Sequence, residues 1–346
     1  MTMESCVSIK SIGDVGCGVI MLSACLAAAG PVRSKPGASP QRIAIYYGYP
    51  SLVNGANGDL ARAVSVFADY DVIVLGDGLE LDTSDRNTAG LEEHRFTSRM
   101  IQALQAAPRH PVVYGYIDLG NTQKLPLQAI TDRIERWARM GARGVFFDEA
   151  GYDFGVTRER QNAAVVATHA RGLRACLNAF RPADVFGSAR TGLNAAGGGN
   201  PDGLPPAIAG DDALMLESFA VRNGVPEPTD ALAARTREAL DGRSRFGTHV
   251  FAVSTSDDHT DHVRLAEFGW WTASVFALDG YGWGMPAYSA VTSRLPWLPR
   301  PGEEASLARA DRAGDVSLRD GRWQRTTMLG TIVVDTTTHR GALEKR

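Results

Sequence analysis

Short apolar segments alternate with helix-like segments along most of this chain, from Ile43 to Leu278. Eight of the apolar segments have the length and composition of buried strands, and they cover residues 43–49, 72–75, 112–117, 144–147, 174–178, 214–219, 249–255 and 275–278. Eight such units over about 250 residues predict an α/β fold, a (β/α)8 barrel of the TIM type. A doubly wound open sheet accepts the same alternation and is the alternative.

Helices are predicted between most of these strands from the spacing of their apolar residues. The predicted helices cover residues 59–70, 91–106, about 126–140, 158–171, 229–240 and 263–273. Pro126 suits the first turn of its helix, where a proline is favoured. The fifth unit has no evident helix, because residues 187–210 are rich in glycine and loop-like.

The two ends of the chain differ from this pattern, which suggests three parts. Residues 1–41 are interpreted as a signal or lipoprotein leader with a flexible tether, and residues 42–296 as the barrel. Residues 297–346 are interpreted as a small C-terminal β appendage with short strands at 316–318, 323–327 and 331–334.

The leader carries the sequence Leu22-Ser23-Ala24-Cys25, which has the pattern of a bacterial lipoprotein signal. Lys10 is its only upstream positive charge, so an unstructured start without a signal is the alternative. We therefore expect an exported protein at the cell envelope, anchored to a membrane by a lipid on Cys25, or a secreted one. Cys176 is the one cysteine of the folded part, so no internal disulfide is expected there.

The composition excludes some classes of partner. The chain has 346 residues, 44% of them hydrophobic, and a formal net charge of -3, so its charge gives no reason to expect binding to nucleic acid. No segment approaches the roughly 20 apolar residues that a membrane span needs. We expect a monomer whose partner is a carbohydrate polymer, for the reasons that follow.

The candidate catalytic residues follow the fourth predicted strand. The run Gly144–Phe147 ends in two adjacent carboxylates, Asp148 and Glu149. A buried strand has no structural use for two acids, whereas chemistry is usually placed at the carboxyl ends of barrel strands. Paired carboxylates at that position suit general acid–base catalysis, above all the hydrolysis of glycosidic bonds.

Polar and aromatic residues also follow the other predicted strands. Glu217 lies at the end of the sixth strand and is a third candidate catalytic acid. The candidate substrate-binding residues are Tyr47, Tyr49, Asp77, Tyr116, Asp118, Asn178, Asp279, Tyr281 and Trp283. Aromatic rings stack on sugar faces and carboxylates bind hydroxyl groups, so this set suits a sugar ligand. Asp118 has a second interpretation as a helix N-cap.

A metal site is not expected, and neither is a cofactor. The loop that contains Asp257, Asp258, His259, Asp261 and His262 is rich in potential ligands. Its two histidines are three residues apart, and Asp261 is better placed to cap the following helix.

The segment Val113-Tyr114-Gly115-Tyr116-Ile117, a helix ending near Trp137, and Gly144–Ala150 together resemble the spherulin-4-like proteins, which are glycoside hydrolase family 135. Asn178 and Glu217-Ser218-Phe219 continue the same pattern. The wider group includes the related family 114 barrel glycosidases. The resemblance implies a barrel that cleaves α-1,4-linked galactosamine or N-acetylgalactosamine polymers, with Asp148, Glu149 and Glu217 as the functional acids.

The sequence thus predicts an exported glycoside hydrolase that acts on a polysaccharide. Two divisions of labour remain open. In one, Glu149 is the general acid while Asp148 orients a 2-acetamido group of the substrate; in the other, Glu217 is the second carboxylate. The alternative functions are a non-catalytic carbohydrate-binding barrel and a metal-dependent polysaccharide deacetylase.

Overall fold

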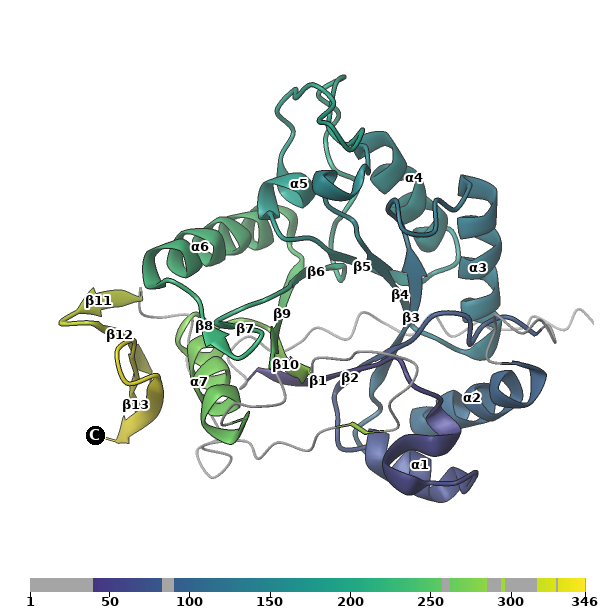
Figure 1. The fold of residues 1–346 in the computed structure, drawn as a ribbon, viewed down its shortest axis with the longest axis horizontal. Helices are drawn as coiled ribbons and strands as arrows, with labels where there is room; N and C mark the ends of the chain where they lie inside the picture. The colour runs from purple at the N-terminus through teal and green to yellow at the C-terminus, as the bar shows by residue number, and fades with distance from the viewer. Residues whose placement is uncertain are drawn as a thin grey trace, which may run out of the picture. The chain divides into compact units, whose positions relative to one another are not determined.

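The computed structural model describes residues 40–82, 90–256, 262–284, 294–295, 316–327 and 329–345. Eight parallel strands close into a barrel, and each strand pairs with its neighbours in chain order (Figure 1). The barrel strands are β1 (Gln41–Tyr46), β2 (Val72–Leu75), β3 (Val112–Asp118), β4 (Gly144–Asp148), β5 (Arg174–Asn178), β6 (Ala213–Leu216), β9 (His249–Thr255) and β10 (Gly280–Gly284). The predicted (β/α)8 barrel is confirmed, and the open sheet is excluded because β1 pairs with both β2 and β10.

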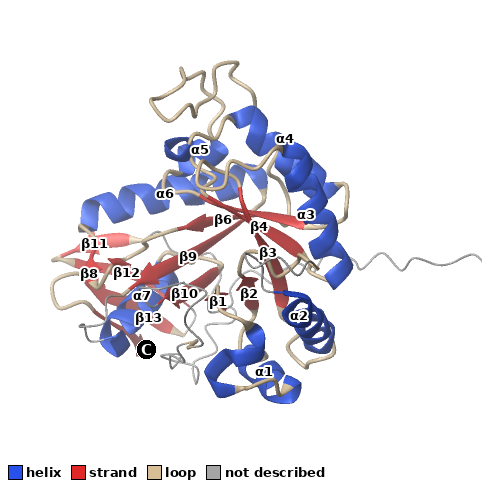
Figure 2. Ribbon diagram, turned by 45° about the vertical axis from the view of Figure 1, so that its right-hand side comes forward, coloured by secondary structure: helices blue, strands red, loops and turns tan. Residues whose placement is uncertain are grey.

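Helices follow the strands and surround the barrel, as Figure 2 shows. They are η1 (Pro50–Gly55), α1 (Leu60–Phe67), α2 (Gly90–Gln105), α3 (Leu127–Met140), η2 (Tyr152–Phe154), α4 (Arg158–His169), α5 (Pro182–Phe186), α6 (Thr229–Phe246) and α7 (His262–Val275). Local signals set their ends: Asp59 caps α1, Thr157 caps α4, and Gly141 ends α3 in the left-handed conformation. Among the described helices, none is both long enough and apolar enough to cross a membrane.

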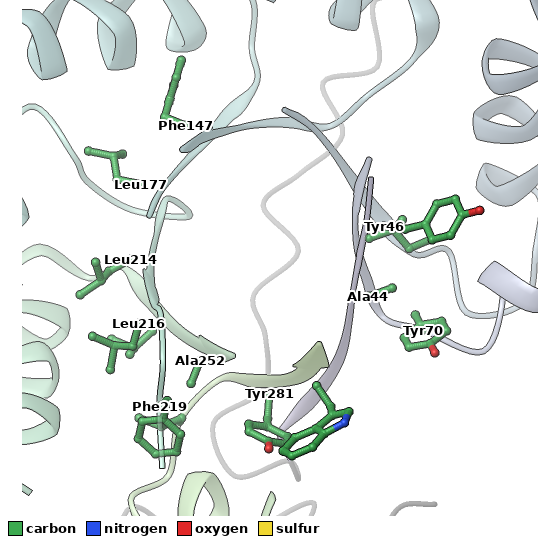
Figure 3. Packing of buried hydrophobic residues seen from close by; sticks show 14 of the residues in the cluster. Ala44, Tyr46, Tyr70, Phe147, Leu177, Leu214, Leu216, Phe219, Ala252 and Tyr281 are labelled. Carbon is green, nitrogen blue, oxygen red and sulfur yellow. The ribbon is translucent and has the colours of Figure 1, made fainter. Parts of the chain in front are cut away.

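Alternate residues of each strand face the inside and the outside of the barrel. The inward residues form a separate apolar cluster, which includes Ile43, Val74, Tyr114, Phe146, Cys176, Met215 and Phe251. The outward residues pack against the helices, and Figure 3 shows Phe147, Leu177 and Leu214 pointing away from the ring of strands. The barrel is therefore a filled core, and only its ends are open to ligands.

The motif around Gly115 is explained by this two-sided packing. The ring of Trp137 on α3 lies against the outer face of Gly115, where a Cβ atom would be 2.0 Å from it. The indole nitrogen Nε1 of Trp137 donates to the carbonyl oxygen of Tyr116 at 3.1 Å. Glycine at 115 thus lets α3 approach β3 closely and fixes the strand that carries Tyr116.

The fifth unit keeps only a short helix, α5. Buried Arg158 on α4 replaces the missing helical packing, because its guanidinium donates to the carbonyl oxygens of Asp184, Val185 and Gly187 at 2.8–3.0 Å. The glycine-rich stretch at residues 187–210 is a loop, as predicted, and it contacts α4 through a hydrogen bond from Arg158 N to Gly199 O.

The prediction for the eighth strand is wrong. Val275 is the last residue of α7, and residues 276–279 form the connection to β10, which begins at Gly280. The strand itself was missed because three of its five residues are glycines, which are rare in strand interiors. Gly280 and Gly282 lie against Ile43 of β1, where larger side chains would collide with it.

The C-terminal segment forms the predicted β appendage. Its antiparallel strands are β11 (Ser317–Arg319), β12 (Arg322–Thr327), β13 (Gly330–Asp335) and β14 (Arg340–Lys345). Trp323 packs edge-on against Phe276 with ring centroids 5.2 Å apart, which joins this sheet to the end of α7. A small hairpin, β7 (Val221–Arg222) with β8 (Val225–Pro226), was not predicted. The expected leader, including Cys25, lies outside the described residues.

Candidate functional site

Three polar side chains meet at the carboxyl-terminal mouth of the barrel, from the neighbouring strands β4, β5 and β6. Asp148 and Asn178 are the last residues of β4 and β5, and Glu217 directly follows β6. Each lies two residues beyond an inward apolar residue, so all three are on the inward side. The amide nitrogen of Asn178 donates to Asp148 Oδ1 at 2.7 Å and reaches Glu217 Oε2 at 3.4 Å.

This bridging amide fixes the spacing of the two carboxylates. Because one nitrogen contacts both Asp148 and Glu217, their nearest oxygens lie within about 6 Å of each other. Carboxylate pairs in retaining glycosidases are about 5–5.5 Å apart, and pairs in inverting enzymes are about 6.5–9.5 Å apart. This limit falls between the two ranges, and it keeps both carboxylates within reach of one glycosidic bond.

Asp148 is held by donors on several sides. The backbone N–H of Glu149 donates to Asp148 Oδ1 at 2.9 Å, in addition to the bond from Asn178. The Tyr116 hydroxyl also interacts with this carboxylate. Burial raises the pKa of Asp148, while these donors act in the opposite direction. The result is an oriented carboxylate in a poorly solvated position.

Glu217 is on the open side of the same group. Its side chain reaches solvent, yet the walls of the mouth remove part of the water around the carboxylate, and this desolvation raises the pKa of Glu217. The negative charge of Asp148 raises that pKa further. Ser218, the next residue, has a left-handed φ of 53°, so the chain turns sharply immediately after the acid.

Glu149 points away from this pair. It has a left-handed φ of 52°, which breaks the strand alternation and turns its side chain toward the loop after β3. Thr122 binds it there through its hydroxyl and through its backbone N–H, the latter at 3.1 Å. Gly120 leaves the necessary space, since a Cβ atom on it would be 2.6 Å from the Cβ of Glu149.

Asp118 ends β3 beside Asp148 and is fully buried. Among the described residues, neither of its carboxylate oxygens has a hydrogen-bond partner of normal geometry, although the backbone groups of Gly120 and Gln123 act to lower its pKa. Burial raises the pKa of Asp118 to about 6, and the negative charge of Glu149 adds to the effect. Its alternative interpretation as a helix N-cap is not supported, because no helix begins after β3 until α3 at Leu127.

Tyr47 and Tyr116 form the aromatic part of the mouth. Their rings meet edge to face, with centroids 5.2 Å apart, above the inward apolar cluster. Tyr116 also approaches the ring of Phe146, at 6.1 Å. Burial raises the pKa of Tyr116, with Asp148 as the second cause, so its hydroxyl stays protonated and available as a donor.

Two further candidates have other partners. Asp77 follows β2 and forms an ion pair with Arg133 of α3 at 2.6 Å, and it also accepts a hydrogen bond from Gln123 at 2.7 Å. Tyr49 is exposed at the start of η1, and its carbonyl oxygen accepts a hydrogen bond from Tyr46. Neither is part of the group formed by Asp148, Asn178 and Glu217.

The structure places the last three candidates away from the mouth. Asp279 precedes β10, at the amino-terminal end of the barrel, where it pairs with Arg243 at 3.1 Å. Tyr281 faces outward and packs edge-on against Trp270 of α7, and Trp283 shares that outward face. Their prediction as substrate-binding residues depended on the wrong bounds of the eighth strand, so we remove them from the candidate site.

Sequence reasoning did not find two residues that hold the acids in place. Thr122 binds Glu149 from a loop 27 residues earlier. Arg235 of α6 donates to the carbonyl oxygens of Glu217 and Ser218 at 3.2 and 2.8 Å. Neither residue type carries a sequence signal of its own, because the contact exists only after the chain has folded.

Within the described part of the chain, no group of three or more histidine, cysteine or acidic side chains is arranged to hold a metal ion. The ligand-rich loop from Asp257 to Asp261 lies outside the described residues, as does the side chain of His262.

No protein-family model matches the chain, and none of the curated proteins compared with it matches in sequence. Solved barrel structures are similar to it in fold. An α-L-fucosidase isoenzyme 2 from Paenibacillus thiaminolyticus shares 10% identity over 74% of this chain and 47% of its own, with a TM-score of 0.46. An endoglucanase shares 8% identity over 73% and 91%, with a TM-score of 0.45. An aldolase of the HpcH/HpaI type from Desulfitobacterium hafniense shares 10% over 72% and 87%, with a TM-score of 0.38. Glycosidases and aldolases are thus both among these barrels, so the likeness does not select a reaction.

Proposed function

We propose that this protein is a glycoside hydrolase whose two working carboxylates are Asp148 and Glu217. The observation that carries the proposal is the single amide of Asn178 that contacts both acids at the mouth of the barrel. This contact holds the carboxylates of β4 and β6, on either side of β5, close enough to act on one glycosidic bond, and we assign them a retaining mechanism.

The environments of the two acids suggest their roles. Glu217 is accessible and has a raised pKa, so it is suited to donate a proton to the glycosidic oxygen as the leaving sugar departs. Asp148 is oriented by several donors and is suited to attack the anomeric carbon as a carboxylate, forming a glycosyl ester. Water, deprotonated by Glu217, then hydrolyses that ester and releases the sugar with retained configuration.

In this scheme Glu149 has a supporting role at the entrance. Its contacts with Thr122 hold its side chain against the loop after β3 and away from the amide of Asn178. We therefore prefer Glu217 to Glu149 as the general acid. The substrate-assisted route, with Glu149 as the acid and Asp148 orienting a 2-acetamido group, is the competing division of labour.

We propose an amino-sugar polysaccharide as the substrate, consistent with the resemblance to the spherulin-4-like family. The acids of the mouth repel one another: the charge of Glu149 raises the pKa of Asp118, and the charge of Asp148 raises that of Glu217. A protonated amino group on a galactosamine unit would relieve this repulsion. The aromatic pair Tyr47 and Tyr116 offers apolar surface to a sugar ring. Export and anchoring through Cys25 are part of the same proposal.

The test is to incubate the purified protein with an α-1,4-linked galactosamine/N-acetylgalactosamine polymer and to determine product masses and the anomeric configuration by NMR. We expect shortened oligosaccharides that are initially of retained configuration, and their loss in Asp148→Asn. Release of acetate without chain shortening, abolished by EDTA and restored by zinc, would identify a deacetylase instead. Binding of the polymer without any product would identify a carbohydrate-binding barrel.

A further inference from the structure

A cavity lies on the carboxyl-terminal side of the barrel, between α5 and α6. Its volume is about 490 Å³, within the range of about 300–1,000 Å³ that small-ligand sites occupy. Figure 1 shows α5 and α6 side by side next to the ends of β5 and β6. The lining residues come from the loop after β5 and from the first half of α6, both on the carboxyl-terminal side.

The lining has the chemistry of a sugar-binding surface. Phe180 is 39% exposed, so part of its ring surface is available to a ligand. Arg181 provides hydrogen-bond donors, and Glu227 and Glu238 provide acceptors that also suit a protonated amine. Ala231 and Ala234 have small side chains, so this part of α6 does not fill the cavity.

Arg235 connects this cavity to the mouth. Its guanidinium lies over the ring of Phe180, 4.6 Å from the centroid, and lines the cavity. The same guanidinium donates to the carbonyl oxygens of Glu217 and Ser218. One side chain thus spans the distance between the cavity and the turn that carries the proposed proton donor.

We propose that the α5–α6 cavity is a further subsite for the polysaccharide, which holds sugar units of the same chain outside the catalytic mouth. This inference rests on the proposed function. It implies that the protein favours long chains over short ones, because a long chain can occupy the mouth and the cavity together, whereas a trisaccharide can bind in the mouth alone.

The test fills the cavity without touching the acids. Ala234→Trp and, separately, Ala231→Trp place a bulky ring in the cavity from an exposed helical position. Ala61→Trp is the matched control, since Ala61 is also an exposed alanine in the first turns of a rim helix, α1. The substrates are the α-1,4-linked galactosamine/N-acetylgalactosamine polymer and a trisaccharide of the same units.

We expect both cavity variants to raise KM for the polymer about three- to tenfold, the effect of losing a stacking contact and its neighbours. The kcat/KM for the trisaccharide should stay within about twofold of the wild type, as for Ala61→Trp. Migration in a gel that contains the polymer gives a readout without turnover: Asp148→Asn should be retarded, and Asp148→Asn with Ala234→Trp should be retarded less.

Two results would overturn the subsite while leaving the hydrolase standing. One is an unchanged KM for the polymer in both cavity variants; the other is an equal loss on polymer and trisaccharide, which would indicate damage to the Glu217 turn. A wild-type protein that cleaves neither substrate would remove the proposed function, and the subsite with it.

Discussion

The two ends of the barrel contain similar acids in opposite electrostatic surroundings. At the amino-terminal end, Asp279 accepts a backbone hydrogen bond from Val250 at 2.8 Å and pairs with Arg243 and His249. These donors hold the pKa of Asp279 below its usual range, with the His249 side chain as the largest lowering influence, although burial acts the other way. Asp212 at the same end is bound by two backbone N–H groups and by His169.

At the carboxyl-terminal mouth the acids have raised pKa values instead. Burial raises the pKa of Asp118, Asp148 and Glu217, and their neighbours are further acids. The difference shows that a buried carboxylate in this fold can be stabilised when close donors and a cation outweigh its burial. At the mouth, the charge of Arg222 lowers the pKa of Glu217 only in part, so burial still raises it. Acids kept in such surroundings are costly to stability and point to a function there.

The largest expected effect is on catalysis at the mouth. Glu217→Gln keeps the shape of the side chain and removes its proton, so kcat/KM on the polymer should fall by about 10²–10⁴. Because the pKa of Glu217 is raised and its protonated form is the active one, wild-type activity should decline as the pH rises through that pKa. The variant should lose this alkaline limb from its residual activity.

Glu149→Gln is the comparison that decides between the two divisions of labour. Under the scheme with Glu217 as the acid, it should reduce activity less than Glu217→Gln does. The reverse order, with Glu149→Gln the more damaging change, would establish Glu149 as the general acid.

A smaller effect is expected on stability at the mouth. The pKa of Asp118 rises from 3.8 to about 6 on folding, so the folded state binds more protons, and stability falls as the pH rises between these values. Asp118→Asn removes that penalty. Its free energy of unfolding should exceed that of the wild type by about 1–3 kcal/mol above pH 6, and the gain should vanish below about pH 4. Urea unfolding at several pH values measures this, and a variant destabilised at neutral pH would contradict the account of the mouth.

At the amino-terminal end of the barrel, removing a carboxylate should lower stability by a similarly small amount. The lowered pKa of Asp279 means that its ionised form stabilises the fold at neutral pH, and that this contribution is lost as the pH falls through the folded pKa. Asp279→Asn should therefore reduce the free energy of unfolding by about 1–3 kcal/mol at pH 7. The deficit should shrink in acid. A deficit that persists unchanged at low pH would show that packing, and not charge, is responsible.

Much of the architecture could be predicted from local patterns. The bounds of β2, β5 and β9 were predicted to the residue, because their apolar and β-branched residues are bounded by polar ones. β10 could not be predicted, since its glycines are selected by the close approach of Ile43 and Phe251, which only the closed barrel creates. Val275, the last residue of α7, and the apolar connection that follows it were mistaken for that strand.

Part of the candidate site was also predictable from the positions of the strands. Asp148, Asn178 and Glu217 follow strands, so strand position alone brings them together at one end. The turn at Glu149 was not predictable, because its left-handed backbone depends on Thr122 and on the space left by Gly120. The hydrogen bond from Arg235 to the carbonyl oxygen of Glu217 was not predictable either. These residues are 18 positions apart, and the β7–β8 hairpin between them was not predicted.

The most direct test of the difference between the two ends compares Asp148→Asn with Asp279→Asn in one assay. Both changes remove a carboxylate from the barrel and keep its shape. Reducing-end release from the galactosamine polymer should fall by about 10² or more in Asp148→Asn. In Asp279→Asn it should stay within about twofold of the wild type at a temperature where the variant is folded. Full activity in a folded Asp148→Asn protein, or a comparable loss in both variants, would contradict the assignment of the mouth as the catalytic end.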